Sequence, residues 1–276
     1  MSMPVSRELS AEGIRLKKLC DAVAESVAVS TRSLVGDPAS GDVLEMGADG
    51  TPTKMIDRMA EDAALAVLEE SGLGFAVLSE ELGKTTIGDE PRYFLHLDPL
   101  DGTFNAVKGI PFYSISIYID GQDCRFGYVF DLAHKIGFYA QAGCGAWTEP
   151  SHRIRVSEAR SLADFSVAAY TLRPHTARII RLGDTVRRIR TLGSCALELC
   201  LVASGKLDAF ADLRGGLRMV DVAAGSLIVE EAGGVVTDGD GKRIPFNGDM
   251  WQRKMFLASN GPAHRKLLDL MGGGNL

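Results

Sequence analysis

The hydrophobic pattern of the first 72 residues predicts two long helices separated by a glycine-rich loop. Apolar residues recur with helical spacing from Glu12 to Leu34, which predicts the first helix. The second helix is predicted to start at Thr51-Pro52, an N-cap followed by proline in the first turn, and to end at Ser71-Gly72. Between them, Val35 to Gly50 holds five glycine or proline residues. Loops of this length are often functional, so this one is a candidate to close over a substrate.

Apolar runs with strand periodicity predict a sheet in the rest of the first half. In Tyr113–Ile119 every second residue is large and apolar, as in a strand with one buried face. Asp120-Gly121 directly after it is a hairpin signal. The other predicted strands are Phe75–Leu78, Tyr93–Leu97, Phe126–Phe130 and Ile136–Ala140. We therefore expect residues 1–150 to form an antiparallel sheet with the two helices against it.

Strand-like and helix-like patterns alternate in residues 151–276, which predicts a second half of more α/β character. The predicted strands are Phe165–Ala169, Ile189–Leu192, Leu207–Ala211, Val235–Thr237 and Met255–Ala258. The predicted helices are His175–Leu182, Cys195–Ala203, Val222–Glu231 and Pro262–Met271. The expected fold class is therefore a layered α/β (α+β) sandwich of two halves, with a site between them.

Composition narrows the class of protein without naming a reaction. The 276 residues are 46% hydrophobic and 24% charged, with a mean hydropathy of +0.05, as in soluble globular proteins. No apolar run reaches the roughly 18 residues of a membrane-spanning helix. The charged stretch from Met1 to Cys20 has no signal-peptide core. A net charge of −6 argues against nucleic acid as a partner, and five cysteines without a Cys-x-x-Cys pair favour a reducing compartment. We expect a cytoplasmic protein.

The strongest chemical signal is the segment Asp98-Pro99-Leu100-Asp101-Gly102-Thr103, which follows a predicted strand. Pro99 restricts the backbone and Gly102 permits a close approach, so the two carboxylates can converge. With the Leu100 carbonyl they offer only oxygen ligands, which suit a hard cation such as Mg²⁺ or Mn²⁺. The N–H groups of Gly102 and Thr103 suit a phosphate oxygen. A turn with two solvated aspartates is the alternative.

Three further carboxylates stand where such a site could use them. Glu80 follows a predicted strand, and Asp57 lies in the first turns of its predicted helix. Asp221 stands at the start of another predicted helix, where aspartate is also a common cap. Each has an ordinary alternative explanation, respectively an exposed loop, a solvated helix face and a helix cap.

Together these segments have the order and separation of one family. The chain resembles the inositol monophosphatase superfamily over about Glu12 to Leu268, in the segments Gly47-Ala48-Asp49-Gly50-Thr51-Pro52-Thr53, Ser79-Glu80-Glu81, Asp98–Thr103 and Val220-Asp221-Val222-Ala223-Ala224-Gly225. It is most similar to the archaeal-type bifunctional fructose-1,6-bisphosphatase/inositol monophosphatase branch, also in Leu192–Leu199. The resemblance implies the sugar-phosphatase fold, Mg²⁺ dependence, lithium sensitivity and homodimers.

The resemblance also implies a metal ligand set. Glu80, Asp98 and the Leu100 carbonyl would hold one Mg²⁺, and Asp98, Asp101 and Asp221 a second, with Asp98 bridging. A weaker third ion near Glu80 would make two or three per site, and Mn²⁺ would substitute. Such a pair places positive charge on both the attacking and the leaving oxygen of a phosphoryl transfer.

The implied catalytic groups surround this ligand set. Asp57 and Thr103 would orient and deprotonate the attacking water, and Glu80 is counted with them. Asp101, Gly102 and Thr103 would bind the phosphate.

The substrate side is less determined by the resemblance. Seven positions before the last metal aspartate, where the inositol-specific branch carries an acidic residue, this chain has Arg214. Arg214 and Arg218 place cations where a second phosphate could bind, a task that guanidinium geometry suits. Surface solubility or an ion pair with Asp212 explains these arginines equally well. The other candidate substrate contacts are Tyr170, Arg173, Gly193 and Ser194.

The expected function is Mg²⁺-dependent hydrolysis of a phosphomonoester by a metal-activated water. The expected substrate is the 1-phosphate of fructose 1,6-bisphosphate, with inositol monophosphate also accepted, which places the enzyme in carbohydrate metabolism and gluconeogenesis. A dedicated inositol-1-monophosphatase and a 3′-phosphoadenosine 5′-phosphate phosphatase are the enzymatic alternatives. A catalytically silent metal- or ligand-binding regulator is the non-enzymatic one. The expected partner is a small phosphorylated sugar or polyol, not a membrane.

Overall fold

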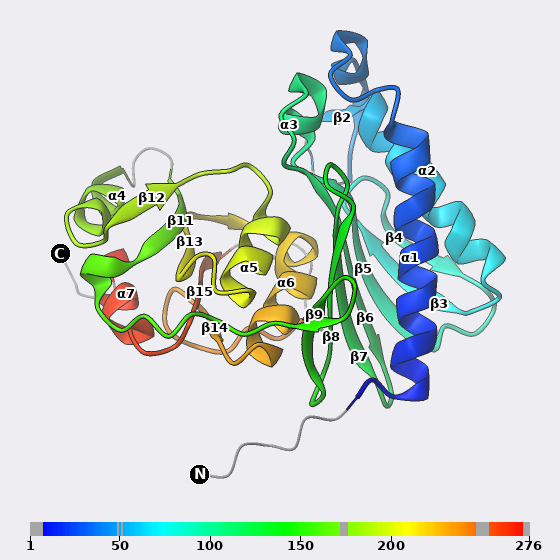
Figure 1. Ribbon diagram of the computed structural model, residues 1–276. Helices are drawn as coiled ribbons and strands as arrows, with labels where there is room; N and C mark the ends of the chain where they lie inside the picture. Colours follow the sequence, from blue (N-terminus) through cyan, green and yellow to red (C-terminus); the bar gives the residue numbers. More distant parts are fainter. Residues whose placement is uncertain (1–7, 49, 51, 172–175, 247–253, 273–276) are drawn as a thin grey trace.

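The elements of the chain stack in five alternating layers of helix and sheet (Figure 1). A computed structural model describes residues 8–48, 50, 52–171, 176–246 and 254–272. The helices are α1 (Ala11–Thr31), α2 (Met55–Glu70), α3 (Thr103–Lys108), α4 (Thr176–Gly183), α5 (Cys195–Ala203), α6 (Met219–Glu231) and α7 (His264–Met271), with 3₁₀ turns η1 (Pro38–Gly41) and η2 (Leu162–Asp164). The predicted layered α/β fold is confirmed.

The larger sheet has eight strands in the order β10-β9-β8-β7-β6-β5-β3-β4. They are β3 (Phe75–Ser79), β4 (Gly83–Ile87), β5 (Tyr93–Asp101), β6 (Ser114–Gly121), β7 (Arg125–Asp131), β8 (Ile136–Gln141), β9 (Gly145–Thr148) and β10 (His152–Arg153). Helices α1 and α2 cover one face. The expectation of a wholly antiparallel sheet was wrong at one pair, because β3 and β5 run parallel. Their carboxyl ends therefore reach the same edge.

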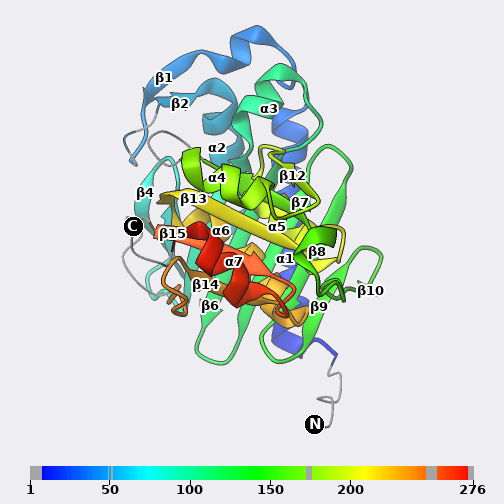
Figure 2. The same ribbon diagram turned by 90° about the vertical axis from the view of Figure 1, so that its left-hand side faces the viewer.

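The smaller sheet has five strands in the order β12-β11-β13-β15-β14. They are β11 (Ser166–Tyr170), β12 (Arg188–Arg190), β13 (Ala209–Leu217), β14 (Val235–Asp238) and β15 (Lys254–Ser259). Strand β11 pairs parallel with β12 and β13, whereas β15 pairs antiparallel with β13 and β14. Figure 2 shows α4 and α7 over the outer face of this sheet.

Helices α5 and α6 form the middle layer and pack against both sheets. Nearly every side chain of these two helices is buried, as expected for helices that are apolar on all sides. Gly127 of β7 permits the contact, since a Cβ there would lie 2.8 Å from the Ala224 carbonyl oxygen of α6. The chain passes from one sheet to the other between Arg153 and Ser166, and the two halves share one core.

The start of the second helix differs from the prediction. Pro52 lies in β2 (Pro52–Lys54), which pairs with β1 (Val43–Met46), and α2 begins at Met55 with Lys54 as its N-cap residue. Thr51 lies outside the described residues. Proline is tolerated here because a two-stranded ribbon leaves one side of each strand unpaired. The predicted loop Val35–Gly50 therefore contains η1 and β1.

Two smaller expectations also change. Asp120-Gly121 is not the turn itself but the end of β6, and the Gly121 N–H donates to the Cys124 carbonyl oxygen at 2.9 Å across the turn. Helix α6 begins at Met219, three residues earlier than predicted. Among the described residues, no helix is both long and apolar enough to cross a membrane.

Candidate active site

The parallel pairing of β3 and β5 brings the first acidic residues together. Ser79 pairs with Leu97 at the ends of the two strands, and the Glu80 N–H donates to the Leu97 carbonyl oxygen at 3.2 Å. Glu80 therefore lies beside Asp98 at the edge of the sheet. The start of α6 adds Asp221, the third residue of that helix.

One carboxylate oxygen from each of Glu80, Asp98 and Asp221 lies within 4.8 Å of the other two. Asp98 and Asp221 are buried and Glu80 is partly buried. Burial, together with the neighbouring carboxylates, raises the pKa of Asp98 well above its usual value. Burial also raises the pKa of Glu80 to about 8, against the opposing charge of Arg218. The cluster is therefore electrostatically unfavourable unless a cation neutralises it.

Arg218 supplies a positive charge to this cluster. Its guanidinium Nη1 lies 2.7 Å from Glu80 Oε1, and its Nη2 lies 2.9 Å from Asp221 Oδ1. A buried set of carboxylates that already holds one cationic group fits a divalent cation, because its donors are all hard oxygens. The structure thus places Arg218, predicted as a substrate contact, among three of the predicted metal ligands.

Asp101 takes a different position. Its Oδ2 accepts hydrogen bonds from the Ser194 hydroxyl at 2.6 Å and the Ala196 N–H at 2.7 Å, at the start of α5. Burial raises its pKa to about 6. Asp101 therefore ties β5 to the middle helix layer and is not one of the three converging residues. The Leu100 carbonyl accepts from the Thr103 hydroxyl at 3.1 Å, and the Leu100 N–H donates to Asp98 Oδ1 at 3.0 Å.

Asp57 and Thr103 form the predicted pair. The Thr103 hydroxyl donates to Asp57 Oδ1 at 2.8 Å, and the Lys54 N–H donates to Asp57 Oδ2 at 3.1 Å. Asp57 is only 4% exposed, and burial raises its pKa while the hydrogen bond from Thr103 opposes the shift. Gly102 precedes Thr103 with φ +95°, and a Cβ there would lie 3.1 Å from the Gly193 carbonyl oxygen. Glycine is thus required where the two halves approach each other.

The Gly193-Ser194 segment is held from both halves of the molecule. The Tyr170 hydroxyl accepts from the Gly193 N–H at 2.9 Å, and Asn105 Nδ2 donates to the Leu192 carbonyl oxygen at 2.8 Å. Ser194 is fully buried, and its hydroxyl lies 3.0 Å from that of Ser114 in addition to its bond with Asp101. Only Gly193 of this predicted pair is exposed.

Arg214 is held in a fixed position at the end of the smaller sheet. Its Nε donates to Asp212 Oδ2 at 2.7 Å, and its guanidinium carbon lies 4.7 Å from the centre of the Tyr170 ring. The ion pair with Asp212, given above as the alternative explanation, is present. Its side chain nevertheless keeps 28% exposure, so a ligand can reach it. Arg173, the other predicted arginine, lies outside the described residues.

Several polar residues around the site did not emerge from the sequence. Buried Glu61 accepts from the Ser79 hydroxyl and from the Leu82 N–H, and Glu81 accepts from the Thr53 hydroxyl. Fully buried Glu198 accepts from the Leu192 N–H at 2.7 Å. A signal for Glu198 existed, since it is the one charged residue in an otherwise apolar helix. These groups support the strand ends and the Leu192–Ser194 segment.

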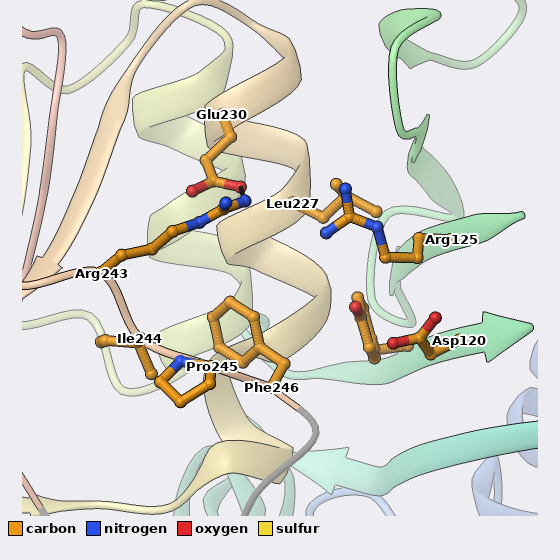
Figure 3. Close-up of a pocket in the computed structure, with 9 residues that line it drawn as sticks. Asp120, Arg125, Leu227, Glu230, Arg243, Ile244, Pro245 and Phe246 are labelled. Carbon is orange, nitrogen blue, oxygen red and sulfur yellow. Dashed lines mark ion pairs between the residues drawn. The ribbon is translucent and has the colours of Figure 1, made fainter.

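A separate cavity of about 340 Å³ lies near the other end of α6 (Figure 3). Its charged lining residues are Asp120, Arg125, Glu230 and Arg243, of which Arg243 and Glu230 form an ion pair at 3.9 Å. The positive and negative side chains balance, and none of the predicted site residues lines the cavity. It is not part of the candidate active site.

Comparisons with known proteins agree with this geometry. A family model described as the inositol monophosphatase family matches residues 16–271. A fructose-1,6-bisphosphatase/inositol-1-monophosphatase of Methanothermobacter thermautotrophicus is 41% identical over 263 residues, which cover 90% of this chain and 94% of that protein. A bifunctional NADP phosphatase/NAD kinase of Methanococcus maripaludis is 36% identical over 91% of this chain, but only 48% of that protein is covered.

Solved structures give the same result. A hypothetical protein of Pyrococcus horikoshii, described as similar to inositol-1 monophosphatase, is 30% identical with a TM-score of 0.80. The match covers 94% of this chain and 97% of that one. The chain therefore belongs to the inositol monophosphatase family.

Proposed function

We propose that the protein is a Mg²⁺-dependent phosphoric monoester hydrolase that removes the 1-phosphate of fructose 1,6-bisphosphate and also accepts inositol monophosphate. The observation that carries this proposal is the convergence of Glu80, Asp98 and Asp221 close in the chain to the hydrogen-bonded pair of Asp57 and Thr103. Relatives named as bifunctional fructose-1,6-bisphosphatase/inositol-1-monophosphatases support the choice of substrates. Release of inorganic phosphate from fructose 1,6-bisphosphate, with and without Mg²⁺, tests it.

Glu80, Asp98 and Asp221 would hold the cation, and the family resemblance adds Asp101 and the Leu100 carbonyl for a second ion, with a third near Glu80. A bound divalent cation lowers the pKa of water and neutralises charge on the attacking and leaving oxygens. Two or three Mg²⁺ ions, replaceable by Mn²⁺, are part of the proposal.

The remaining chemistry falls to the protein's own side chains. Because Thr103 Oγ1 donates its hydrogen to Asp57 Oδ1, its lone pairs are available to accept a hydrogen from the attacking water. Asp57 then takes the proton, a role that its burial favours by raising its pKa. The Gly102 and Thr103 N–H groups, together with Asp101, are proposed to position the phosphate.

Arg214 is proposed to bind the second phosphate of the sugar, next to Tyr170 and Gly193. Its pairing with Asp212 and its stacking on Tyr170 hold the guanidinium in one orientation, which favours bidentate recognition of a phosphate. Arg173 and Ser194 stay in the proposal from the sequence alone, and Arg218 would join them only after leaving the carboxylates.

Arg214→Glu is expected to lower kcat/KM for fructose 1,6-bisphosphate by about tenfold or more and to spare inositol 1-phosphate, because only the bisphosphate carries a second anionic group. Since a new carboxylate beside buried Asp212 also threatens folding, Arg214→Met is the matched variant, with the same expected direction. Initial rates on both substrates give the measurement. Equal losses on both would remove Arg214 from substrate choice.

The names of other relatives favour a second candidate substrate. The bifunctional NADP phosphatase/NAD kinases of two methanogens match more than nine-tenths of this chain. NADP, like 3′-phosphoadenosine 5′-phosphate, carries a phosphomonoester on an adenosine ribose. Both belong in any substrate panel, beside a dedicated inositol-1-monophosphatase activity and a silent regulatory role.

Four further properties are proposed on the family resemblance. The chain would form homodimers, would be inhibited by lithium, and would act in the cytoplasm in carbohydrate metabolism, as a step of gluconeogenesis. None of them is used in the argument that follows.

A further inference from the structure

Arg218 uses two of the three carboxylates that would hold the cation. Its guanidinium bridges Glu80 and Asp221, with Nε 3.1 Å from Asp221 Oδ1 in addition to the two ion pairs above. The side chain is only 18% exposed, so solvent screens these contacts weakly. Arg218 and a divalent cation therefore draw on the same donor groups.

The backbone keeps Arg218 at this place. Arg218 is the N-cap residue of α6, and its N–H donates to Asp221 Oδ2 at 3.1 Å. The guanidinium, by contrast, stands on a flexible chain of four rotatable bonds and can turn away without moving the helix. The chain therefore combines a fixed anchor with a side chain that can leave the cluster.

Two cations cannot share these oxygens without cost. A guanidinium and a divalent ion a few ångströms apart repel each other, and in a partly buried site the repulsion is much stronger than in water. Either the guanidinium withdraws or the ion binds more weakly. Both outcomes lower the measured affinity for the ion.

We propose that Arg218 is an internal competitor of the divalent cation, which sets the affinity of the Glu80–Asp98–Asp221 cluster and, once displaced, binds the incoming phosphate. Cation and phosphate binding are then coupled, because each favours the conformation in which Arg218 has left the carboxylates. This inference rests on the proposed metal site but not on the choice of substrate.

The test is the Mg²⁺ affinity of the full-length protein by titration calorimetry, with and without inorganic phosphate. Arg218→Met should bind Mg²⁺ roughly tenfold more tightly or better, and Arg218→Lys should lie between it and the unchanged protein. Phosphate should tighten Mg²⁺ binding in the unchanged protein and do so much less in Arg218→Met. The matched control is Arg243→Met, which breaks an arginine–glutamate pair at the other end of α6 and should leave Mg²⁺ affinity unchanged.

The outcomes separate this inference from the proposed function. If the unchanged protein binds no Mg²⁺, the metal site itself is wrong. If it binds Mg²⁺ and a folded Arg218→Met binds equally or more weakly, Arg218 orients the carboxylates and the competition is refuted. Thermal unfolding of each variant in saturating Mg²⁺ shows whether it is folded.

Discussion

Asp57→Asn is expected to lower kcat on the order of 10³-fold while Mg²⁺ binding persists. The substitution keeps the size of the side chain but removes the group that takes the proton from the attacking water. Asp57 is not one of the three converging carboxylates, so the cation site stays intact. The amide can also keep one of the two hydrogen bonds now made to Thr103 and the Lys54 N–H. Phosphate release and Mg²⁺ titration on the same preparation give the measurement.

Thr103 supplies the control for this experiment. Thr103→Ser keeps the hydroxyl that donates to Asp57 and should retain most of the activity, whereas Thr103→Ala should lose about as much as Asp57→Asn. An Asp57→Asn variant that keeps turnover within a few-fold of the unchanged protein would exclude Asp57 as the base.

Asp98→Asn is expected to abolish the thermal stabilisation by Mg²⁺ and nearly all activity, and yet to raise the Tm measured in EDTA by a few degrees. The pKa of Asp98 is raised well above its usual value by burial and by Glu80, Asp101 and Asp221. A group whose pKa is raised on folding destabilises the folded state once the pH exceeds that pKa in its charged form. Asparagine removes this charge and can still accept from the Leu100 N–H.

Thermal unfolding in EDTA and in millimolar Mg²⁺ provides the comparison. The unchanged protein should unfold at a higher temperature in Mg²⁺, because a ligand that binds only the native state stabilises it. Asp240→Asn, at a side chain that is 75% exposed, should behave like the unchanged protein in both buffers. A lower Tm for Asp98→Asn in EDTA, or a full Mg²⁺ response, would contradict the account of the cluster.

The acidic residues could be found in the sequence because each lies in a short segment with its own local signal. Asp98 stands in a Pro- and Gly-containing turn, Glu80 follows a strand, and Asp57 and Asp221 lie in the first turns of helices. Such signals depend on neighbours in the chain. The structure brings Glu80, Asp98 and Asp221 together and pairs Asp57 with Thr103, whereas the metal roles of Asp101 and Leu100 stay predictions.

The position of Arg218 could not be predicted, because it depends on contacts between distant segments. The guanidinium reaches Glu80 only since the end of β3 and the start of α6 meet at one edge of the larger sheet. The parallel pairing of β3 and β5 and the start of α2 after Pro52 have the same cause. In both, strand pairing overrides the local propensity that the sequence displays.

The most direct test of the proposed activity is phosphate release by the purified protein with and without Mg²⁺. The panel is fructose 1,6-bisphosphate, inositol 1-phosphate, 3′-phosphoadenosine 5′-phosphate and NADP. We predict release that requires Mg²⁺ and is fastest from fructose 1,6-bisphosphate, with inositol 1-phosphate second. Faster release from an adenosine phosphate would keep the mechanism and replace the substrate. No release from any member, while Mg²⁺ still raises the Tm, would contradict the account and leave a metal-binding regulator.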